Sequence, residues 1–320
     1  MIPINKKYFF ITLSILFSLL GAILVMESYA RIFLDDGKNL NFEMLKYAKK
    51  LKKISKDKKI GIEHKKNKNI KLMNVNIKLN SQGFRNDYNL NQSKIKILML
   101  GDSMTFGWGA NKTFSNNLEE KLGDKFQVIN AGIGNTNTYM QVNNFFQNYK
   151  DYNFDFIILN FFINDLEKVR VKKGYFIEKN FYIYTFLKSK IHEILIRFSL
   201  KDNWNEFYSK TFDDEKFINK TLNEILRLSE YCNKNNVPFV INNIPELRDL
   251  KNYQFEEETN LIEKFAIENN IIFLNSMEIL KNNDEESLWV SAEDPHLNDK
   301  AHLLIANFLY KELLTDFNSL

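Results

Sequence analysis

Ser103 has the residue type and the position of a nucleophile. It lies in the segment GDSMTFG (101–107), directly after the apolar run 95–100, which predicts a buried strand. The hydroxyl is then expected at the carboxyl end of that strand, where a helix can begin. Backbone N–H groups and the positive end of a helix dipole would there stabilise an oxyanion formed on an attacked acyl group. A tight turn in which Ser103 only caps a helix would have the same sequence.

His296 is the candidate general base. The segment SAEDPHLN (291–298) puts Asp294 two residues before His296, a spacing that can orient the imidazole, although such a turn also occurs where a helix simply starts. A base of this kind must reach the Ser103 hydroxyl, and its acidic partner stabilises the imidazolium that forms. The other three histidines fall in a lysine-rich segment, in an insertion and in the last predicted helix (His64, His192 and His302).

Two further loops end predicted strands and offer hydrogen-bond donors. NAGIGNT (130–136) contains glycines that let the backbone approach a ligand, and Asn135 tolerates a positive φ better than most residues. This loop could donate a second backbone N–H. NFFIND (160–165) adds the side-chain amide of Asn164. Convergence of three loops on one place is more telling than any one of them.

The elements that must position these residues alternate between strands and helices. Strands are predicted at 95–100, 126–130, 156–162, 237–244 and 271–274, and helices at 115–122, 139–149, 217–232, 257–267 and after 298. Such alternation predicts an α/β fold with a five-stranded parallel sheet covered by helices on both faces. Ligands of these sheets bind at the carboxyl ends of the strands.

The sequence pattern near the N-terminus indicates a membrane-spanning segment. Residues 8–26 are 19 uncharged, mainly apolar residues, about the length that spans a hydrocarbon core of ~30 Å as a helix. A cleaved signal peptide is the alternative, because SYA (28–30) resembles a cleavage site, but the apolar run is longer than the ~7–15 residue apolar region of an ordinary signal peptide. Lys6 and Lys7 precede the span, and basic residues also follow it, so charge only weakly places the N-terminus in the cytoplasm and the remaining chain outside.

Two segments do not fit the alternation of strands and helices. The net charge of +4 hides a basic run, since residues 46–71 hold 12 lysines against two acidic residues. Residues 31–79 are rich in Lys and Asn and would repel themselves, so we interpret them as a solvated or lipid-surface stalk. Nucleic-acid binding is the alternative, but neither Arg nor aromatic residues interleave in the densest part, 49–68. Residues 166–214 predict an aromatic-rich helical insertion that lines a substrate groove, rests on the membrane or packs on itself.

These segments, in this order, resemble the SGNH subgroup of the GDSL hydrolases, a superfamily of serine esterases, deacylases and O-acyltransferases. The resemblance covers about residues 80–313 and includes NSQGFR (80–85), GDSMTFGWG (101–109), NAGIGNTNT (130–138), FFINDLE (161–167) and EDPHLN (293–298). It implies a flavodoxin-like three-layer α/β/α fold with Ser103 as nucleophile and His296 as base. The implied oxyanion hole consists of the Ser103 N–H, an N–H from Gly134 or Asn135, and the Asn164 side chain.

The chain departs from the family pattern at three places. Asn135 stands where the family has a glycine, Glu293 stands at the usual aspartate three residues before the histidine, and Phe162 stands at another usual glycine. A backbone donor survives the change to Asn135 if the turn is kept. Asp294 resembles the Asp-x-His spacing of exopolysaccharide O-acetyltransferases in the superfamily, and we assign the acid to Asp294 over Glu293.

The expectation is a membrane anchor at 1–30, a stalk at 31–79 and an SGNH-type catalytic domain at 80–320, single-pass and extracytoplasmic. The expected activity is a serine esterase that removes an O-acyl group, with O-acetyl on a cell-surface or exported glycan favoured, through an acyl-Ser103 intermediate. A glycan O-acyltransferase with the same residues, or a catalytically silent glycan-binding module, is the alternative. We expect no metal, cofactor or nucleic-acid partner, because motifs for nucleotides and zinc are missing and Cys232 is the single cysteine.

Overall fold

The computed structural model describes residues 6–169, 171 and 174–320, and these form two compact units. The first combines the described parts of Met1–Lys49 and Lys173–Lys201, and the second combines Lys50–Lys172 with Asp202–Leu320. The boundary differs from the expected one at residue 79. The predicted insertion is also divided, because its middle belongs to the first unit and its two ends belong to the second.

The first unit is entirely helical. Its elements are α1 (Lys6–Tyr29), the π-helical turn η1 (Ala30–Leu34), α2 (Leu40–Lys50), α6 (Phe176–Asn180) and α7 (Tyr182–Arg197). Within the described residues, Tyr8–Leu34 is the one helical segment long and apolar enough to cross a membrane, with a mean hydropathy of 2.6. A signal sequence near an N-terminus would have the same length and composition.

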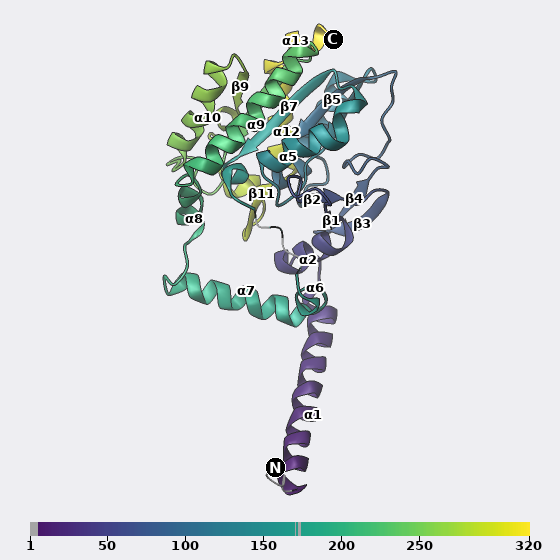
Figure 1. The fold of residues 1–320 in the computed structure, drawn as a ribbon, viewed down its shortest axis with the longest axis vertical. Helices are drawn as coiled ribbons and strands as arrows, with labels where there is room; N and C mark the ends of the chain where they lie inside the picture. Colours follow the sequence, from purple (N-terminus) through teal and green to yellow (C-terminus); the bar gives the residue numbers. More distant parts are fainter. Residues whose placement is uncertain (1–5, 170, 172–173) are drawn as a thin grey trace. The chain divides into compact units, whose positions relative to one another are not determined.

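The second unit is built on a five-stranded parallel sheet (Figure 1). The strand order is β6-β5-β7-β8-β9, which is the flavodoxin-like order 2-1-3-4-5. The strands are β5 (Ile95–Leu100), β6 (Phe126–Asn130), β7 (Phe156–Phe162), β8 (Phe239–Ile244) and β9 (Ile272–Asn275). The predicted bounds of β5, β6 and β7 are confirmed to the residue, and those of β8 and β9 are shifted by one or two residues.

Helices cover both faces of this sheet, which makes three layers (Figure 1). One face packs against α4 (Phe114–Leu122) and α12 (Asp299–Glu312), and the other against α5 (Thr138–Asn144), α9 (Glu215–Lys234) and α10 (Glu256–Glu268). Along β5, Ile97 and Met99 join the first core while Leu98 and Leu100 join the second. Burial on both faces explains why these strands are continuous apolar runs. Shorter helices complete the unit: α3 (Ser103–Phe106), α8 (Trp204–Thr211), α11 (Met277–Leu280) and α13 (Leu314–Asn318).

Residues 50–79 are folded, which corrects the expectation of a solvated stalk. They form the antiparallel pairs β1 (Lys52–Ile54) with β2 (Ile62–His64), and β3 (Lys68–Leu72) with β4 (Val75–Leu79). Their apolar side chains are buried in the second unit, among them Ile60, Leu72, Val75, Ile77 and Leu79. Most of the lysines alternate with these apolar residues and stay at the surface, with Lys52 partly buried, so the high charge did not prevent folding.

His296 lies in a hairpin and not in the plain loop that we expected. β10 (Trp289–Ser291) pairs with β11 (Asp294–Leu297), and α12 starts two residues after β11. Two aromatic residues of α8 pack against the core of the second unit, since Trp204 and Tyr208 each contact Phe255 edge to face. For this part of the predicted insertion the aromatic side chains serve packing.

Candidate active site

The structure brings Ser103, His296 and Asp294 together at the carboxyl edge of the sheet. His296 Nε2 lies 2.9 Å from Ser103 Oγ, and His296 Nδ1 lies 2.5 Å from Asp294 Oδ1. If Nδ1–H donates to the carboxylate, Nε2 is left as the acceptor for the Ser103 hydroxyl. This is the geometry of a serine nucleophile with a general base and an orienting acid, formed by residues from two segments of the chain, the Ser103 turn and β11.

Asp294 is the carboxylate in contact with the histidine, whereas Glu293 is exposed. Asp294 is buried, and its second oxygen accepts a hydrogen bond of 3.0 Å from Trp108 Nε1. Burial alone would raise the pKa of Asp294, but the hydrogen bonds and the charge of His296 together with the Trp108 N–H outweigh it and hold the pKa below its usual range. The carboxylate is therefore ionised where it must stabilise an imidazolium.

The turn that carries Ser103 is fixed by the residues on either side of it. Gly101 has φ +157°, and a Cβ there would clash with Thr105 Oγ1, so only glycine fits. Asp102 caps the following turn by accepting a hydrogen bond of 2.8 Å from the Met104 N–H. The helix expected after Ser103 is the single turn α3, so little helix dipole is available at this place.

Asp102 connects the Ser103 turn to the third loop. Its carboxylate is fully buried and lies 3.3 Å from Ser103 Oγ, and the nearby Asn164 side chain acts to lower its pKa. Burial is the main cause of the raised pKa of Asp102. Asn164 thus lies beside Asp102 and the Ser103 turn, as expected. The buried Asn164 Oδ1 has no hydrogen-bond partner among the described residues.

The second loop adopts the expected backbone conformation. Asn135 has φ +62°, which an asparagine tolerates in place of the glycine of the family pattern. Gly132 packs so closely on the backbone of α3 that a Cβ would lie 2.2 Å from the Phe106 nitrogen. The Ile133 N–H donates to the Gly101 carbonyl at 3.1 Å, which joins this loop to the start of the Ser103 turn.

A buried arginine holds the chain after Ser103. Arg85 donates to the carbonyls of Phe106 and Gly107 through Nη1 and to that of Ala110 through Nη2. These carbonyls follow α3 directly, so Arg85 fixes the loop that carries Trp108 to Asp294.

Four residues of the site were not predicted from the sequence. Asp102 and Trp108 lie within the segment GDSMTFGWG, and Arg85 lies within NSQGFR, but only their membership of the motifs was noted. The fourth, Lys52, places Nζ 3.1 Å from the Gly134 carbonyl oxygen. Lys52 could not be singled out from the sequence, because it is one of 12 lysines in residues 46–71.

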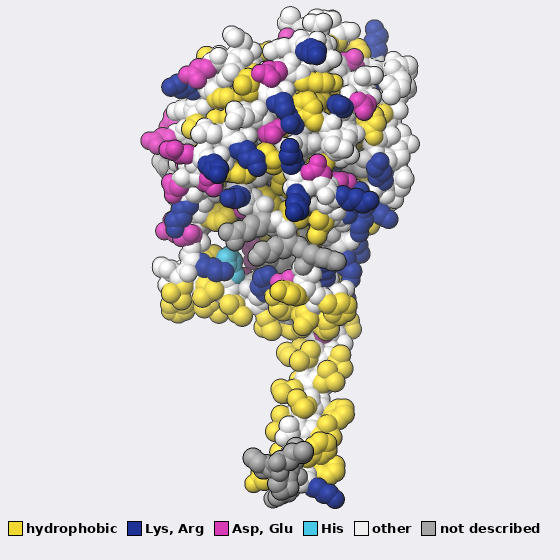
Figure 2. Space-filling model, in the orientation of Figure 1, with side chains coloured by type: hydrophobic (Ala, Val, Ile, Leu, Met, Phe, Trp, Pro, Cys, Tyr) yellow, Lys and Arg dark blue, Asp and Glu magenta, His cyan; other side chains and the backbone are white. Residues whose placement is uncertain are grey.

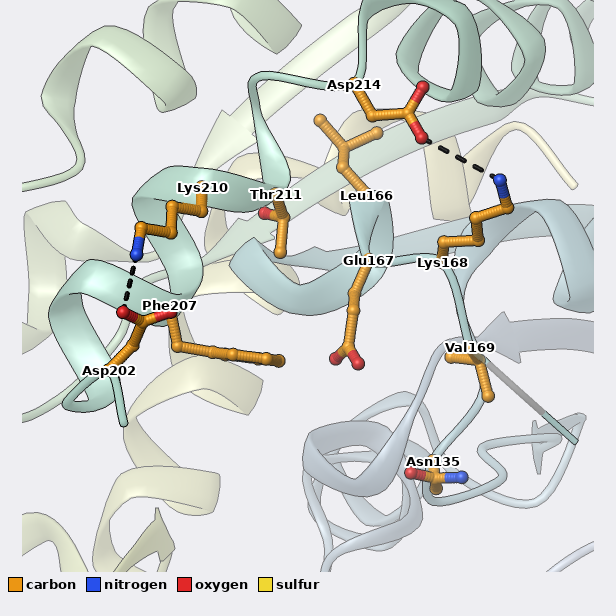
Figure 3. Close-up of a pocket in the computed structure, with 10 residues that line it drawn as sticks. All are labelled: Asn135, Leu166, Glu167, Lys168, Val169, Asp202, Phe207, Lys210, Thr211 and Asp214. Atoms are coloured by element: carbon orange, nitrogen blue, oxygen red, sulfur yellow. Dashed lines mark hydrogen bonds and ion pairs between the residues drawn. The ribbon is translucent and has the colours of Figure 1, made fainter. Parts of the chain in front are cut away.

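A cavity of about 560 Å³ borders the second loop (Figure 3). Asn135 forms part of its wall, and Glu167 projects between Phe207 and Val169. The ion pairs Lys168–Asp214 and Lys210–Asp202 line it as well. Burial raises the pKa of Glu167. Ser103 and His296 do not line this cavity, whose walls combine these charged residues with apolar ones.

The remaining histidines are not placed for catalysis. His64 and His302 are buried, and burial lowers the pKa of each to about 3. His302 Nδ1 accepts a hydrogen bond of 3.0 Å from the Phe114 N–H, while His192 is exposed in the first unit. Among the residues that the structure describes, no group of three or more His, Cys, Asp or Glu side chains is arranged to hold a metal ion.

No family model and no curated protein matches the chain. Several solved structures are similar to it. One, assigned to the G-D-S-L family of lipolytic proteins, comes from Desulfitobacterium hafniense and has 15% identity, coverage of 68% of this chain and 99% of the other, and a TM-score of 0.42. An acetyl xylan esterase has 16% identity, coverage of 68% and 100%, and a TM-score of 0.43. A lipase/acylhydrolase from Enterococcus faecalis has 14% identity, coverage of 69% and 96%, and a TM-score of 0.41. At these low identities and TM-scores, the function has to be inferred from this chain's own residues.

Proposed function

We propose that the protein is a membrane-anchored serine ester hydrolase of the SGNH type. The observation that carries this proposal is the Ser103–His296–Asp294 arrangement, with 2.9 Å between Ser103 Oγ and His296 Nε2 and 2.5 Å between His296 Nδ1 and Asp294 Oδ1. A serine used only as a helix cap has no need of a histidine that is itself oriented by a buried carboxylate.

In the first half of the reaction, Ser103 Oγ attacks the acyl carbon of an ester while His296 Nε2 accepts the hydroxyl proton. The tetrahedral oxyanion is held by the Ser103 N–H, by the second-loop N–H of Asn135 or Gly134, and by the Asn164 side-chain amide. Collapse breaks the bond to the alcohol, which leaves with the proton from His296 and gives acyl-Ser103.

In the second half, His296 accepts a proton from water, and the resulting hydroxide attacks acyl-Ser103. The acid leaves and Ser103 recovers its proton from His296. A sugar hydroxyl in place of water would make the protein an O-acyltransferase with the same residues. The contact between Asp294 and His296 supports this second candidate. Asp294 lies two residues before His296, and this Asp-x-His spacing resembles that of the exopolysaccharide O-acetyltransferases.

A short acyl group on a glycan is the substrate we propose. The cavity beside Asn135 has charged walls made by Glu167 and two ion pairs, which suit hydroxyl-rich ligands better than a long hydrocarbon chain. The apolar helix at Tyr8–Leu34 would anchor the chain in a membrane, and we propose that the second unit works outside the cytoplasm on a cell-surface or exported glycan.

The test is serine labelling and ester hydrolysis by the full chain in detergent. Wild-type protein and the Ser103→Ala and His296→Ala variants are treated with a fluorophosphonate probe and, separately, with p-nitrophenyl acetate. Labelling and hydrolysis by the wild type that disappear in Ser103→Ala support the proposal. A folded wild type that is neither labelled nor active would refute it and favour the silent glycan-binding module.

Hydrolase and transferase differ in their products. The same acyl donor is supplied with and without a glycan acceptor, and the acylated glycan and free acid are measured by mass spectrometry. Acyl transfer to the glycan that depends on Ser103 supports the transferase, whereas free acid alone in both reactions supports the hydrolase.

A further inference from the structure

Helix α7 presents an apolar stripe that nothing else in the function explains. Leu187, Ile191, Ile194 and Phe198 are spaced by four, three and four residues and therefore share one face of the helical segment. Each of the four side chains is at least half exposed. The preceding segment adds three exposed apolar residues, Tyr175, Phe176 and Ile177. An exposed apolar surface of this extent marks an interaction site.

The start of α7 is fixed to the end of the apolar helix α1 within the same unit. The Glu27 carboxylate accepts hydrogen bonds from the backbone N–H groups of Tyr182, at 3.1 Å, and Ile183, at 2.9 Å. Arg31 pairs with Glu27 at 2.7 Å and donates to the Asn180 carbonyl. Helix α7 therefore begins where α1 ends, and it runs across that end and not along it (Figure 1).

The apolar stripe of α7 continues the apolar surface of α1. Figure 2 shows hydrophobic side chains along α1 and along the side of α7 from which α1 projects. Basic residues flank the stripe, with Lys188 on one side and Lys190 and Arg197 on the other, all exposed. A helix with an apolar face between basic residues is typical of an element that lies in the interface of a bilayer, where lysine and arginine side chains reach the headgroups.

We propose that α6 and α7 lie in the interfacial layer of the same membrane that α1 spans, with the stripe Leu187–Ile191–Ile194–Phe198 facing the acyl chains. The first unit is then a two-armed anchor, with one arm across the bilayer and one along its surface. This proposal depends on membrane insertion of α1, and it does not depend on the chemistry at Ser103.

Site-specific fluorescence tests the position of α7. The full chain, with Ile191→Cys, Phe198→Cys or Glu193→Cys, is labelled with an environment-sensitive NBD dye and reconstituted into phosphatidylcholine vesicles. Native Cys232 stays unlabelled, because it is buried and burial raises the pKa of its thiol to about 12. Glu193 is the matched control, since it is exposed on the same helix but outside the stripe.

The dyes at 191 and 198 are expected to emit at shorter wavelength than the dye at 193. They should also be quenched several-fold more strongly by nitroxide-labelled lipid and less by aqueous iodide. Equal iodide quenching at all three positions would overturn the proposal. A second result would also overturn it. If the dye at 191 is shielded from iodide but is not quenched by the nitroxide lipid, and if position 191 cross-links between copies, the stripe is covered by a second chain and not by lipid. Circular dichroism of each variant verifies that the helices are intact.

A second inference concerns Lys52 and comes from different contacts. Lys52 Nζ lies 3.1 Å from the Gly134 carbonyl oxygen, and burial lowers the pKa of Lys52 to about 8. In a trans peptide the carbonyl and the following N–H point in opposite directions, so a contact that fixes the Gly134 carbonyl also fixes the Asn135 N–H. This N–H has no hydrogen-bond partner among the described residues.

We infer that Lys52 is a positioning residue that holds the Gly134–Asn135 peptide with its N–H directed at the oxyanion. The inference rests on the proposed esterase function. A donor that serves only the oxyanion lowers the energy of the transition state more than that of the bound ester, so its loss should appear in kcat and not in KM.

Kinetics of the full chain in detergent test this role. Lys52→Met should lower kcat for p-nitrophenyl acetate by about tenfold or more, with KM and the melting temperature nearly unchanged, and Lys52→Arg should restore part of kcat. The control is Lys53→Met, in the same strand, whose ammonium pairs with Glu63 at 2.7 Å and is half exposed. An active wild type with an equally active Lys52→Met would overturn this inference alone. An inert, unlabelled wild type would overturn the esterase function and this inference with it.

Discussion

Two neighbouring acidic residues differ in their surroundings more than in their chemistry. Asp294 is buried between Trp108 and His296, while Glu293 is exposed next to it. The sequence alone left the assignment to a comparison of spacings. The structure brings only Asp294 to the imidazole, because Asp294 and His296 are two residues apart in β11 and share one side of the strand, whereas Glu293 lies in the turn before it.

The first prediction compares these two acids. Asp294→Asn should lower kcat for p-nitrophenyl acetate by about 10³-fold or more, because a neutral amide can favour the wrong histidine tautomer and does not stabilise an imidazolium. Glu293→Gln is the matched control and should leave kcat within about twofold. Steady-state kinetics of both variants decide the matter, and a large loss in Glu293→Gln would show that the acid is wrongly assigned.

The second prediction concerns acid stability. His302 is buried, and its pKa is lowered from 6.5 to about 3 by burial and by the charge of Arg85. Between these two values the unfolded chain binds a proton that the folded chain does not, so this histidine makes the protein less stable as the pH falls, by up to about 1.4 kcal/mol per pH unit.

His302→Gln removes this titration while retaining an acceptor for the Phe114 N–H. Urea unfolding of the full chain in detergent is measured at about pH 7 and about pH 4.5. The wild type should lose more unfolding free energy on acidification than the variant. Equal losses in the two proteins would contradict the neutral, buried state of His302.

Among the elements, the loop after α3 depends on one side chain. Arg85 donates to three carbonyls in residues 106–110, and this loop supplies Trp108 to Asp294. The third prediction is that Arg85→Met lowers the unfolding free energy by roughly 3 kcal/mol, because buried carbonyls lose a charged donor. It should also lower kcat, since Trp108 and Asp294 lose their fixed positions.

Lys78→Met is the control, because Lys78 is an exposed basic residue of β4. Arg85→Lys should behave like Arg85→Met, since a single ammonium cannot reproduce the fork of the guanidinium. Thermal unfolding and p-nitrophenyl acetate kinetics are measured on all three. Wild-type stability and activity in Arg85→Met would show that the loop is held by other contacts.

The sequence predicted the sheet better than the elements before it. Strands β5 to β7 are buried on both faces, so their apolar runs have sharp ends. Strand β4 reads Val-Asn-Ile-Lys-Leu and buries every second residue, but the lysines around it concealed the period of two. Composition was therefore a poor guide at 50–79, where a few buried side chains outweigh many exposed charges.

At the scale of the whole molecule, residues 50–73 belong to the second unit, which contains Ser103 and His296, and not to the first unit, which contains α1. The fourth prediction is that full-length protein from which 50–73 is deleted loses fluorophosphonate labelling of Ser103, because β1, β2 and β3 and the buried His64 and Lys52 are removed. Deletion of 8–26, which removes most of the apolar helix, should leave labelling intact in detergent. Labelling of the first deletion at the wild-type rate would show that these strands are dispensable.

The association of two distant segments in the first unit could not be predicted from the sequence. The pattern of charge and hydropathy predicted the apolar helix and a helical insertion separately, and nothing in either segment signals that they meet. Their association depends on Glu27, Arg31 and the start of α7, residues about 150 positions apart that each look ordinary in their own surroundings. The proximity of Ser103, Asp294 and His296 was easier to predict, because each lies in a short motif.

The link between Glu27 and α7 sets an order of events during synthesis. A ribosome adds about 5–20 residues per second, so α1 is complete several seconds before residues 182 and 183 are made. During that time the helix can enter the bilayer, and the Glu27 carboxylate still lacks the hydrogen bonds that it accepts from these two backbone N–H groups in the finished protein. The seven strands β1 to β7 are made in between, and the sheet cannot be completed until β8 and β9 have followed. The contact between α1 and α7 therefore forms partway through translation, because α7 is made after β7 and before β8.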